Sequence, residues 1–151
     1  MKITVCTPTF NENKNIRELY SKIKDVFKNL NYDYEHLVID NNSNDGTIEI
    51  LKEIASEDKK FKVIINSKNY GHIKSPFHGL LQSDGDATIL MASDFQDPIE
   101  LIPKYIEDWK KGSKIVLGKK NNSKENKIIF SLRSFFYRFL NSISESDLTV
   151  N

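Results

Sequence analysis

The sequence predicts an α/β domain with a mainly parallel sheet that helices cover on both faces. Short apolar runs typical of buried strands alternate along the chain with longer stretches in which apolar residues recur every three or four positions. Strands that alternate with helices need right-handed crossover connections, and these produce parallel sheets with helices on both faces. Polar clusters follow several predicted strands, where such sheets usually bind ligands.

The first strand and the first helix are predicted near the amino terminus. Residues 3–7 are a buried strand by composition, and we expect it to end at Pro8, which has no N–H to donate to a ladder. The helix that follows has the apolar stripe of a helix packed on a sheet. The stripe consists of Ile16, Leu19, Tyr20, Ile23, Val26, Phe27 and Leu30.

The strand–helix alternation then continues along the chain. Further strands are predicted at residues 35–39, 61–65, 87–91 and 114–117. Helices are predicted between them from the apolar positions of three segments. These positions are Ile48, Leu51, Ile54 and Ala55, then a short helix at residues 76–82, then Leu101, Ile102, Tyr105, Ile106 and Trp109.

Composition limits the kind of protein this is. The 151 residues fit one ordinary domain, and a formal charge of +1 provides no overall field that would recruit nucleic acid. Cys6 is the only cysteine, which excludes an intramolecular disulfide and favours a reducing, cytoplasmic compartment. The sequence shows neither a signal-peptide pattern nor an apolar run of bilayer length, so we expect any contact with a membrane to be peripheral.

The segment after the strand at residues 87–91 is the most informative. If it is extended, Asp94 and Gln96 point the same way, and their two oxygen donors suit Mg²⁺ or Mn²⁺ bound together with substrate phosphates. The alternative is a polar turn without a ligand. For Asp97 we favour a helix cap, because Asp97-Pro98-Ile99-Glu100 has the composition of a helix start.

Two other polar clusters follow predicted strands. Residues 8–12 place Thr9, Asn11 and Glu12 after the first strand, although Asn11 and Asn13 also suit a helix N-cap. Residues 40–47 can be explained as a turn and a cap, but Asp40 directly follows a buried strand, where a carboxylate can accept hydrogen bonds from a nucleobase or ribose. Three such clusters at strand ends together favour a binding site.

Four motifs, in this order and spacing, resemble the inverting family-two glycosyltransferases. They are Pro8-Thr9-Phe10-Asn11-Glu12, residues 39–47, Asn69-Tyr70-Gly71-His72 and Asp94-Phe95-Gln96-Asp97-Pro98. The last motif is similar to the branch that contains dolichol-phosphate mannose synthase and the bacterial polyprenyl-phosphate sugar transferases. The resemblance covers nearly the whole chain.

This resemblance implies a GT-A fold that binds a UDP- or GDP-sugar. Asp94, on which catalysis would depend, and Gln96 would hold Mg²⁺ or Mn²⁺ on the diphosphate. The other residues implied in substrate binding are Pro8, Thr9, Asn11, Glu12, Asp40, Asn42, Asn69, Gly71, Lys74, Ser93 and Asp97. Asn41 and Ala92 stand where many members have acids, so the metal site is expected to depend mainly on Asp94.

The chain is expected to divide into a nucleotide-sugar-binding domain, residues 1–118, and a polar loop with an amphipathic helix, residues 119–151. An aromatic-rich stripe that includes Phe135, Phe136 and Phe139 predicts this helix, which would cover the domain, contact another copy or lie on a membrane surface. Family members usually extend further, so the resemblance implies that acceptor-binding sequence is missing here.

The expected activity is transfer of a sugar, with inversion, to a polyprenyl phosphate or a cell-surface glycan, at the cytoplasmic face of the membrane. A binding or docking module without turnover is one alternative. A sugar nucleotidyltransferase is another, although the sequence lacks the Gly-rich basic phosphate loop expected near its amino terminus.

Overall fold

The computed structural model describes residues 1–118, 131 and 136. Contacts divide the chain into two compact units, Met1–Ser113 and Lys114–Asn151. The predicted amphipathic helix lies outside the described residues, apart from Ser131 and Phe136, which are both helical. None of the helices in the described part of the chain has the length and hydrophobicity that spanning a bilayer requires.

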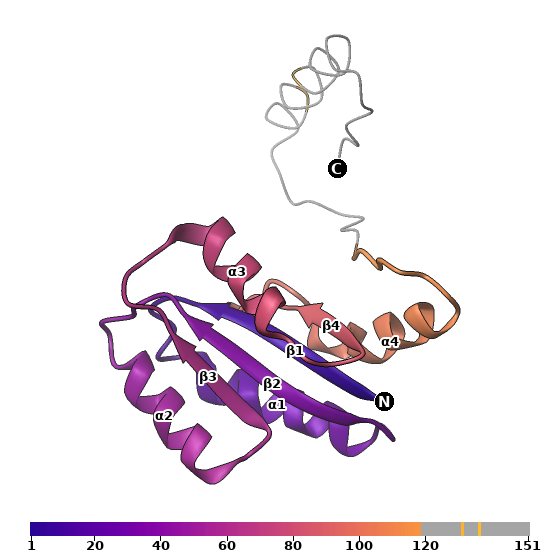
Figure 1. Cartoon of the computed structure of the whole chain (residues 1–151), viewed down its shortest axis with the longest axis horizontal. Coiled ribbons are helices and arrows are strands. Elements are labelled where there is room, and N and C mark those ends of the chain that lie inside the picture. The colour runs from indigo at the N-terminus through magenta and orange to yellow at the C-terminus, as the bar shows by residue number, and fades with distance from the viewer. Residues whose placement is uncertain (119–130, 132–135, 137–151) are drawn as a thin grey trace. The chain divides into compact units, whose positions relative to one another are not determined.

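The first unit is built on a parallel sheet (Figure 1). Its strands are β1 (Lys2–Thr9), β2 (Asp33–Asp40), β3 (Phe61–Ile65) and β4 (Ala87–Leu90), in the spatial order β3-β2-β1-β4. Every pairing is parallel, with Thr9 opposite Asp40 and Asp40 opposite Ile65. The carboxyl ends of β1, β2 and β3 therefore lie together at one edge, as the strand–helix alternation predicts.

Helices cover both faces of the sheet, which confirms the predicted fold class. The helices are α1 (Ile16–Lys28), α2 (Thr47–Glu57), α3 (Gly71–Gln82) and α4 (Ile102–Lys110), and the short 3-10 helix η1 (Ile99–Leu101) precedes α4. Ile3 and Val5 of β1 pack with residues of α1, α2 and α4, whereas Cys6 faces α3. Figure 1 accordingly shows α1 behind the sheet and α3 in front of it.

Pro8 does not end the first strand as the sequence predicted. The strand continues to Thr9, and Pro8 pairs with Ile39 of β2. In β1 the even-numbered residues direct their backbone groups toward β4, since the carbonyl of Cys6 accepts a hydrogen bond from the N–H of Met91. The paired part of β4 ends opposite Cys6. The missing N–H of Pro8 therefore leaves no ladder bond unmade.

Two further expectations needed correction. Residues 114–117 do not form a strand, and Ile115 and Leu117 are 80% and 85% exposed. Apolar composition alone predicted that strand, but no described strand pairs with the segment. Helix α3 begins at Gly71, before the predicted range, and contains Pro76 inside it.

Gly79 allows α3 to approach the sheet closely. A Cβ atom at this position would lie 2.7 Å from Sγ of Cys6 and 3.1 Å from Cγ2 of Ile39. We therefore expect Gly79→Ala to lower the free energy of unfolding by about 1–3 kcal/mol, despite the better helix propensity of alanine. The reason is that α3 or the buried side chains of the sheet would have to shift to make room for the new Cβ. Denaturant unfolding measures this change.

A double variant tests whether the clash is the cause. Cys6→Ala removes the sulfur that the new Cβ would meet, so Gly79→Ala should cost less stability in the Cys6→Ala background than in the wild type. If Gly79→Ala is neutral, or equally costly in both backgrounds, the close contact does not determine the choice of glycine.

Candidate functional site

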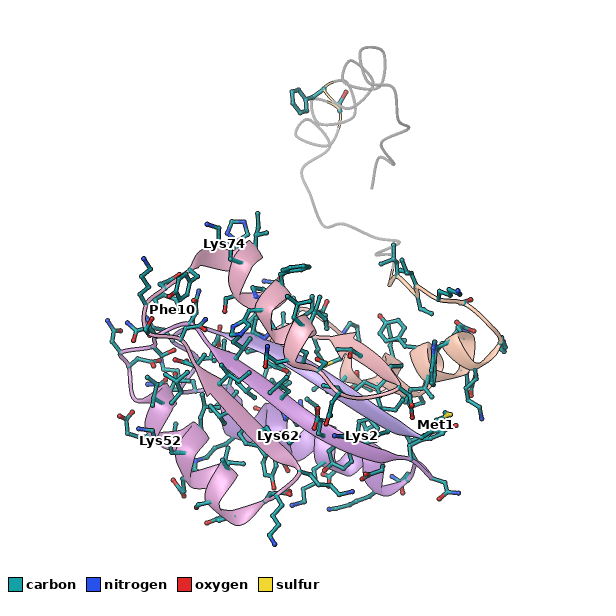
Figure 2. All side chains as sticks on the ribbon, in the orientation of Figure 1. Met1, Lys2, Phe10, Lys52, Lys62 and Lys74 are labelled. Atoms are coloured by element: carbon teal, nitrogen blue, oxygen red, sulfur yellow. The ribbon has the colours of Figure 1, made fainter. Side chains whose placement is uncertain are left out.

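A cavity of about 460 Å³ opens at the carboxyl ends of the strands. β1 and its following loop contribute Pro8, Thr9, Phe10 and Glu12; the segment after β4 contributes Ala92, Ser93 and Asp94; and the segments after β2 and β3, with α3, contribute Asn41, Asn69, Gly71, His72, Ser75 and Pro76. Figure 2 shows Phe10 at this end of the sheet and Met1 at the other. Such strand ends are where ligands bind in open α/β sheets.

The loop after β1 is fastened to the loop after β2. Asn11 has a left-handed backbone (φ 56°), and its N–H donates to Oγ of Ser43 at 2.8 Å. In return, Oδ1 of Asn11 accepts from the N–H of Asn44 at 2.9 Å, and the N–H of Glu12 donates to Oγ1 of Thr47 at 2.9 Å. Asn11 thus joins two loops and is not the N-cap of α1, a position occupied by Asn15.

Asp40 is fully buried at the end of β2. Its Oδ1 accepts from the N–H of Ser43 at 2.9 Å and its Oδ2 from the hydroxyl of Ser43 at 2.5 Å. Asp40 does not line the cavity. Its visible role is to shape the 40–47 loop, while Asn42 is exposed with a left-handed backbone (φ 66°) and also lies off the cavity wall.

Asp94 lies in a tight turn on the cavity wall. Both of its carboxylate oxygens accept hydrogen bonds from Gln96, one from the backbone N–H at 3.2 Å and one from the side-chain amide at 2.5 Å. Phe95 between them has a left-handed backbone (φ 60°), so the segment is not extended as predicted. The turn nevertheless brings the two predicted metal ligands together, and both side chains are exposed.

Asp97 does not cap a helix, contrary to the sequence prediction. Helix η1 begins at Ile99 with Pro98 at its N-cap and no side-chain cap bond. Oδ2 of Asp97 instead accepts from the N–H of Ala92 at 2.9 Å. Asp97 therefore closes the turn that carries Asp94, and Ser93 holds the same turn to β1 by donating from its hydroxyl to the carbonyl of Pro8 at 3.2 Å.

The turn before α3 forms another part of the cavity wall, beside the loop after β1 and the turn after β4. Asn69 and Gly71 line the cavity, and Gly71 has a backbone (φ 84°) that favours glycine. Lys74, one turn further along α3, lines a neighbouring cavity of about 360 Å³ with Tyr70 and His78. Figure 2 shows Lys74 on α3. The structure therefore separates Lys74 from the other predicted donor-binding residues.

The structure thus sorts the residues predicted from the sequence. The cavity wall carries Pro8, Thr9, Glu12, Asn69, Gly71, Ser93 and Asp94. Residues that organise its loops or turns without lining it are Asn11, Asp40, Gln96 and Asp97. Asn42 and Lys74 lie outside it.

Sequence reasoning missed several residues of the wall. Ser75 and Pro76 come from α3, whose start the sequence placed too late, and His72 of the same helix was quoted only as part of a motif. The turn-forming residues Asn69 and Gly71 were the available sequence signal that a turn, and not the interior of a loop, precedes this helix. Phe10 was also missed, and its side chain is 45% exposed on the cavity wall. An aromatic residue in a polar loop could have indicated a surface on which a planar group stacks.

The described residues contain no group of three or more His, Cys, Asp or Glu side chains that could hold a metal by themselves. Asp94 and Glu12 both line the cavity and supply hard oxygen donors. Mg²⁺ and Mn²⁺ are commonly held by one or two carboxylates with substrate phosphates and water. The donor set fits a cation that arrives with a phosphorylated ligand and does not fit one held by protein alone.

Burial excludes Cys6 as a nucleophile. The thiol is buried in β1, and burial raises its pKa to about 11. A neutral thiol is a weak nucleophile, so Cys6 has a packing role.

Curated relatives align with most or all of this chain. The prophage bactoprenol glucosyl transferase homolog of Escherichia coli is 32% identical over 152 residues, which cover 100% of this chain and 50% of the relative. The dolichol-phosphate mannosyltransferase of Pyrococcus furiosus is 40% identical over 118 residues, 78% of this chain and 33% of the relative. The chain spans about half or less of the length of these relatives.

Solved structures show the same fold. Staphylococcus aureus TarS 1–349 in complex with UDP-GlcNAc has a TM-score of 0.61 and 23% identity, over 84% of this chain and 38% of that one. The mannosyltransferase PcManGT from Pyrobaculum calidifontis, in complex with GDP-Man and Mn²⁺, has a TM-score of 0.54 and 23% identity, over 61% and 27%. The GT-A fold implied by the sequence resemblance is confirmed.

A family model described as glycosyl transferase family 2 matches residues 4–149. This range includes β1 from Thr4 onward, every later strand and helix of the first unit and the whole cavity wall. The chain belongs to glycosyl transferase family 2.

Proposed function

We propose that this chain forms the nucleotide-sugar-binding part of an inverting glycosyltransferase that transfers a hexose to a polyprenyl phosphate. The observation that carries the proposal is the cavity at the strand ends, where Asp94 and Glu12 face a space bounded by amide and hydroxyl groups. Its volume lies in the range of small-molecule sites. Relatives named bactoprenol glucosyl transferase support the choice of acceptor.

The donor would lie with its diphosphate near Asp94. A bound Mg²⁺ or Mn²⁺ would stabilise the negative charge that develops on the departing diphosphate. The side-chain amide of Gln96 now donates to Asp94, but a half-turn of that amide would present Oε1 as a second ligand. PcManGT, which was solved with GDP-Man and Mn²⁺, provides a precedent for such a donor and metal in this fold.

Transfer requires few acid–base groups from the protein. In an inverting reaction, an acceptor oxygen attacks the anomeric carbon while the bond from that carbon to the diphosphate breaks, and the bonding pair leaves with the diphosphate. An ionised lipid phosphate is already nucleophilic, so Thr9, Asn69 and Ser93 need only bind and orient the donor. A glycan hydroxyl would need a general base.

A lipid acceptor would also place the enzyme at a membrane surface, where we propose peripheral attachment at the cytoplasmic face.

A titration of nucleotide sugars tests the proposal. We expect UDP- or GDP-sugars to bind with micromolar to millimolar affinity in the presence of Mn²⁺, and binding to weaken when EDTA removes the metal. Calorimetry with UDP-glucose, GDP-mannose and dTDP-glucose measures this directly. Binding of none of these donors, with or without metal, would contradict the proposal.

A turnover assay separates the alternatives. Sugar transfer to polyprenyl phosphate by this chain supports the transferase, whereas donor binding without transfer fits both a binding module and the donor-binding part of a longer transferase. Formation of a sugar nucleotide from a nucleoside triphosphate and a sugar 1-phosphate would identify a nucleotidyltransferase.

A further inference from the structure

Asn41 follows β2 and is only 6% exposed, and both the nitrogen and the oxygen of its side-chain amide make hydrogen bonds. Its Nδ2 donates to Oδ1 of Asn69 at 2.8 Å and to the carbonyl of Gly71 at 3.4 Å. Its Oδ1 accepts from the backbone N–H of Tyr70 at 2.8 Å and from Nδ2 of Asn66 at 3.2 Å. A single amide thus contacts every residue of the 69–71 turn.

These contacts require both a donor and an acceptor at position 41. An ionised aspartate has the same shape but only accepts hydrogen bonds. It would place a carboxylate oxygen against Oδ1 of Asn69, where the amide now donates. Asn69 cannot reverse its own amide without loss, because the same Oδ1 accepts from the N–H of Gly71 at 2.8 Å.

The network also reaches α3. Nδ2 of Asn66 donates to the hydroxyl of Ser75 at 2.9 Å, and the backbone N–H of Asn66 donates to the carbonyl of Asp40 at 2.9 Å. Asn66 and Ser75 are both buried. The end of β2, the turn before α3 and the first half of α3 are therefore joined by buried amide and hydroxyl groups, and Ser75 is also on the cavity wall.

We propose that Asn41 is a positioning residue that holds the 69–71 turn as the wall of the donor cavity. The proposal rests on the proposed function for the identity of the ligand, but not for the contacts themselves. Asn69 and Gly71 line the cavity on the side of α3, whereas Asp94 lies on the wall that follows β4. Release of the turn would change the width of the cavity without altering any group near the metal ligands.

Amide hydrogen exchange tests the contacts without a ligand. In Asn41→Asp, we expect the N–H of Gly71 to exchange about tenfold faster or more, because the turn loses the two bonds that Nδ2 of Asn41 donates and a carboxylate at position 41 repels the Oδ1 of Asn69 that accepts from Gly71. The N–H of Tyr70 should stay protected, since a carboxylate at position 41 still accepts from it. In Asn69→Asp, the N–H of Gly71 should stay protected, because a carboxylate can accept both bonds that Oδ1 now accepts. The same chemical change at the two ends of one hydrogen bond should thus have opposite effects.

Two controls isolate the cause. Asn44→Asp introduces the same charge at an exposed position of the same loop and should leave both amides protected. Exchange at Val5 in the centre of the sheet reports global unfolding, so the increase must be confined to the turn. If Asn41→Asp fails to fold, Asn69→Ala at its exposed position should still release the N–H of Gly71.

Calorimetry with the nucleotide sugar that the wild type binds then tests the positioning role. We expect Asn41→Asp to bind this donor about tenfold more weakly, with its Mn²⁺ dependence retained, and Asn44→Asp to bind like the wild type. Unchanged exchange at Gly71 in Asn41→Asp overturns the inference. Faster exchange with unchanged donor affinity also overturns it. If the wild type binds no donor, the proposed function fails, while the exchange result still decides whether Asn41 holds the turn.

Discussion

The variant Asp94→Asn is expected to lose about 100-fold in Mn²⁺-dependent affinity for a nucleotide sugar and to unfold at the wild-type temperature. The carboxylate is exposed on the cavity wall, and within the described part of the chain its hydrogen bonds come from Gln96. Removing its charge therefore breaks no buried contact. Loss of a charged ligand to a divalent cation and diphosphate is expected to cost about 3 kcal/mol of binding free energy.

The comparison needs a charge-matched control and a second acid of the cavity. Asp25→Asn removes an exposed carboxylate whose ion pair with Lys28 lies within α1, and it should bind donor like the wild type. Glu12→Gln tests whether the other cavity carboxylate shares the metal. Calorimetric titrations with and without Mn²⁺ measure all three variants. Metal-dependent binding that survives in Asp94→Asn but disappears in Glu12→Gln would move the metal site to Glu12.

Acid is expected to destabilise the fold through His36, by about 4 kcal/mol between pH 6.5 and pH 3. The ring is buried in β2, with Nε2 3.0 Å from Oγ1 of Thr7 and an edge-to-face contact with Phe61. Burial lowers the pKa of His36 to about 3. Below pH 6.5 the unfolded chain therefore binds a proton that the folded chain refuses, and the free energy of unfolding falls by up to about 1.4 kcal/mol per pH unit.

Denaturant unfolding between pH 7 and pH 4.5 measures this slope. His36→Phe keeps an aromatic ring beside Phe61 and removes the titrating group, so its stability should change less with pH over this range. Its stability near pH 7 should be lower, because Oγ1 of Thr7 loses its partner. His78→Gln removes an exposed imidazole and should keep the wild-type slope. Equal slopes in His36→Phe and the wild type would show that His36 is not responsible.

Glu35 adds to the acid sensitivity only at lower pH. Burial alone would raise the pKa of this carboxyl, but hydrogen bonds from Lys2, Lys62 and Thr4 outweigh it and lower the pKa to about 2. Figure 2 labels Lys2 and Lys62, the two cations that pair with it. The stabilisation is present above the unfolded pKa of about 4.5 and is lost as the pH falls toward 2. The range from pH 7 to 4.5 therefore isolates His36.

The sequence by itself determined the order of strands and helices and the location of the site. Short apolar runs, and apolar residues that recur every three or four positions, are local properties, so the strand Phe61–Ile65 and the helix that begins at Ile16 followed from them directly. Polar residues at strand ends share an edge in a parallel sheet. The sequence alone therefore predicts that residues such as Asp94 and Glu12 contribute to one site, and both line the same cavity.

Only the tertiary structure decided which polar residues face that cavity. Asp40 and Asp94 both follow buried strands. Asp40 is buried and accepts hydrogen bonds from Ser43, whereas Asp94 lies in a tight turn and is exposed. The role of Asn41 likewise depends on the 69–71 turn, whose first residue, Asn69, lies 28 residues further along the chain. Side-chain partners so distant in sequence leave no local pattern, because their pairing is fixed by the packing of the strands and helices that carry them.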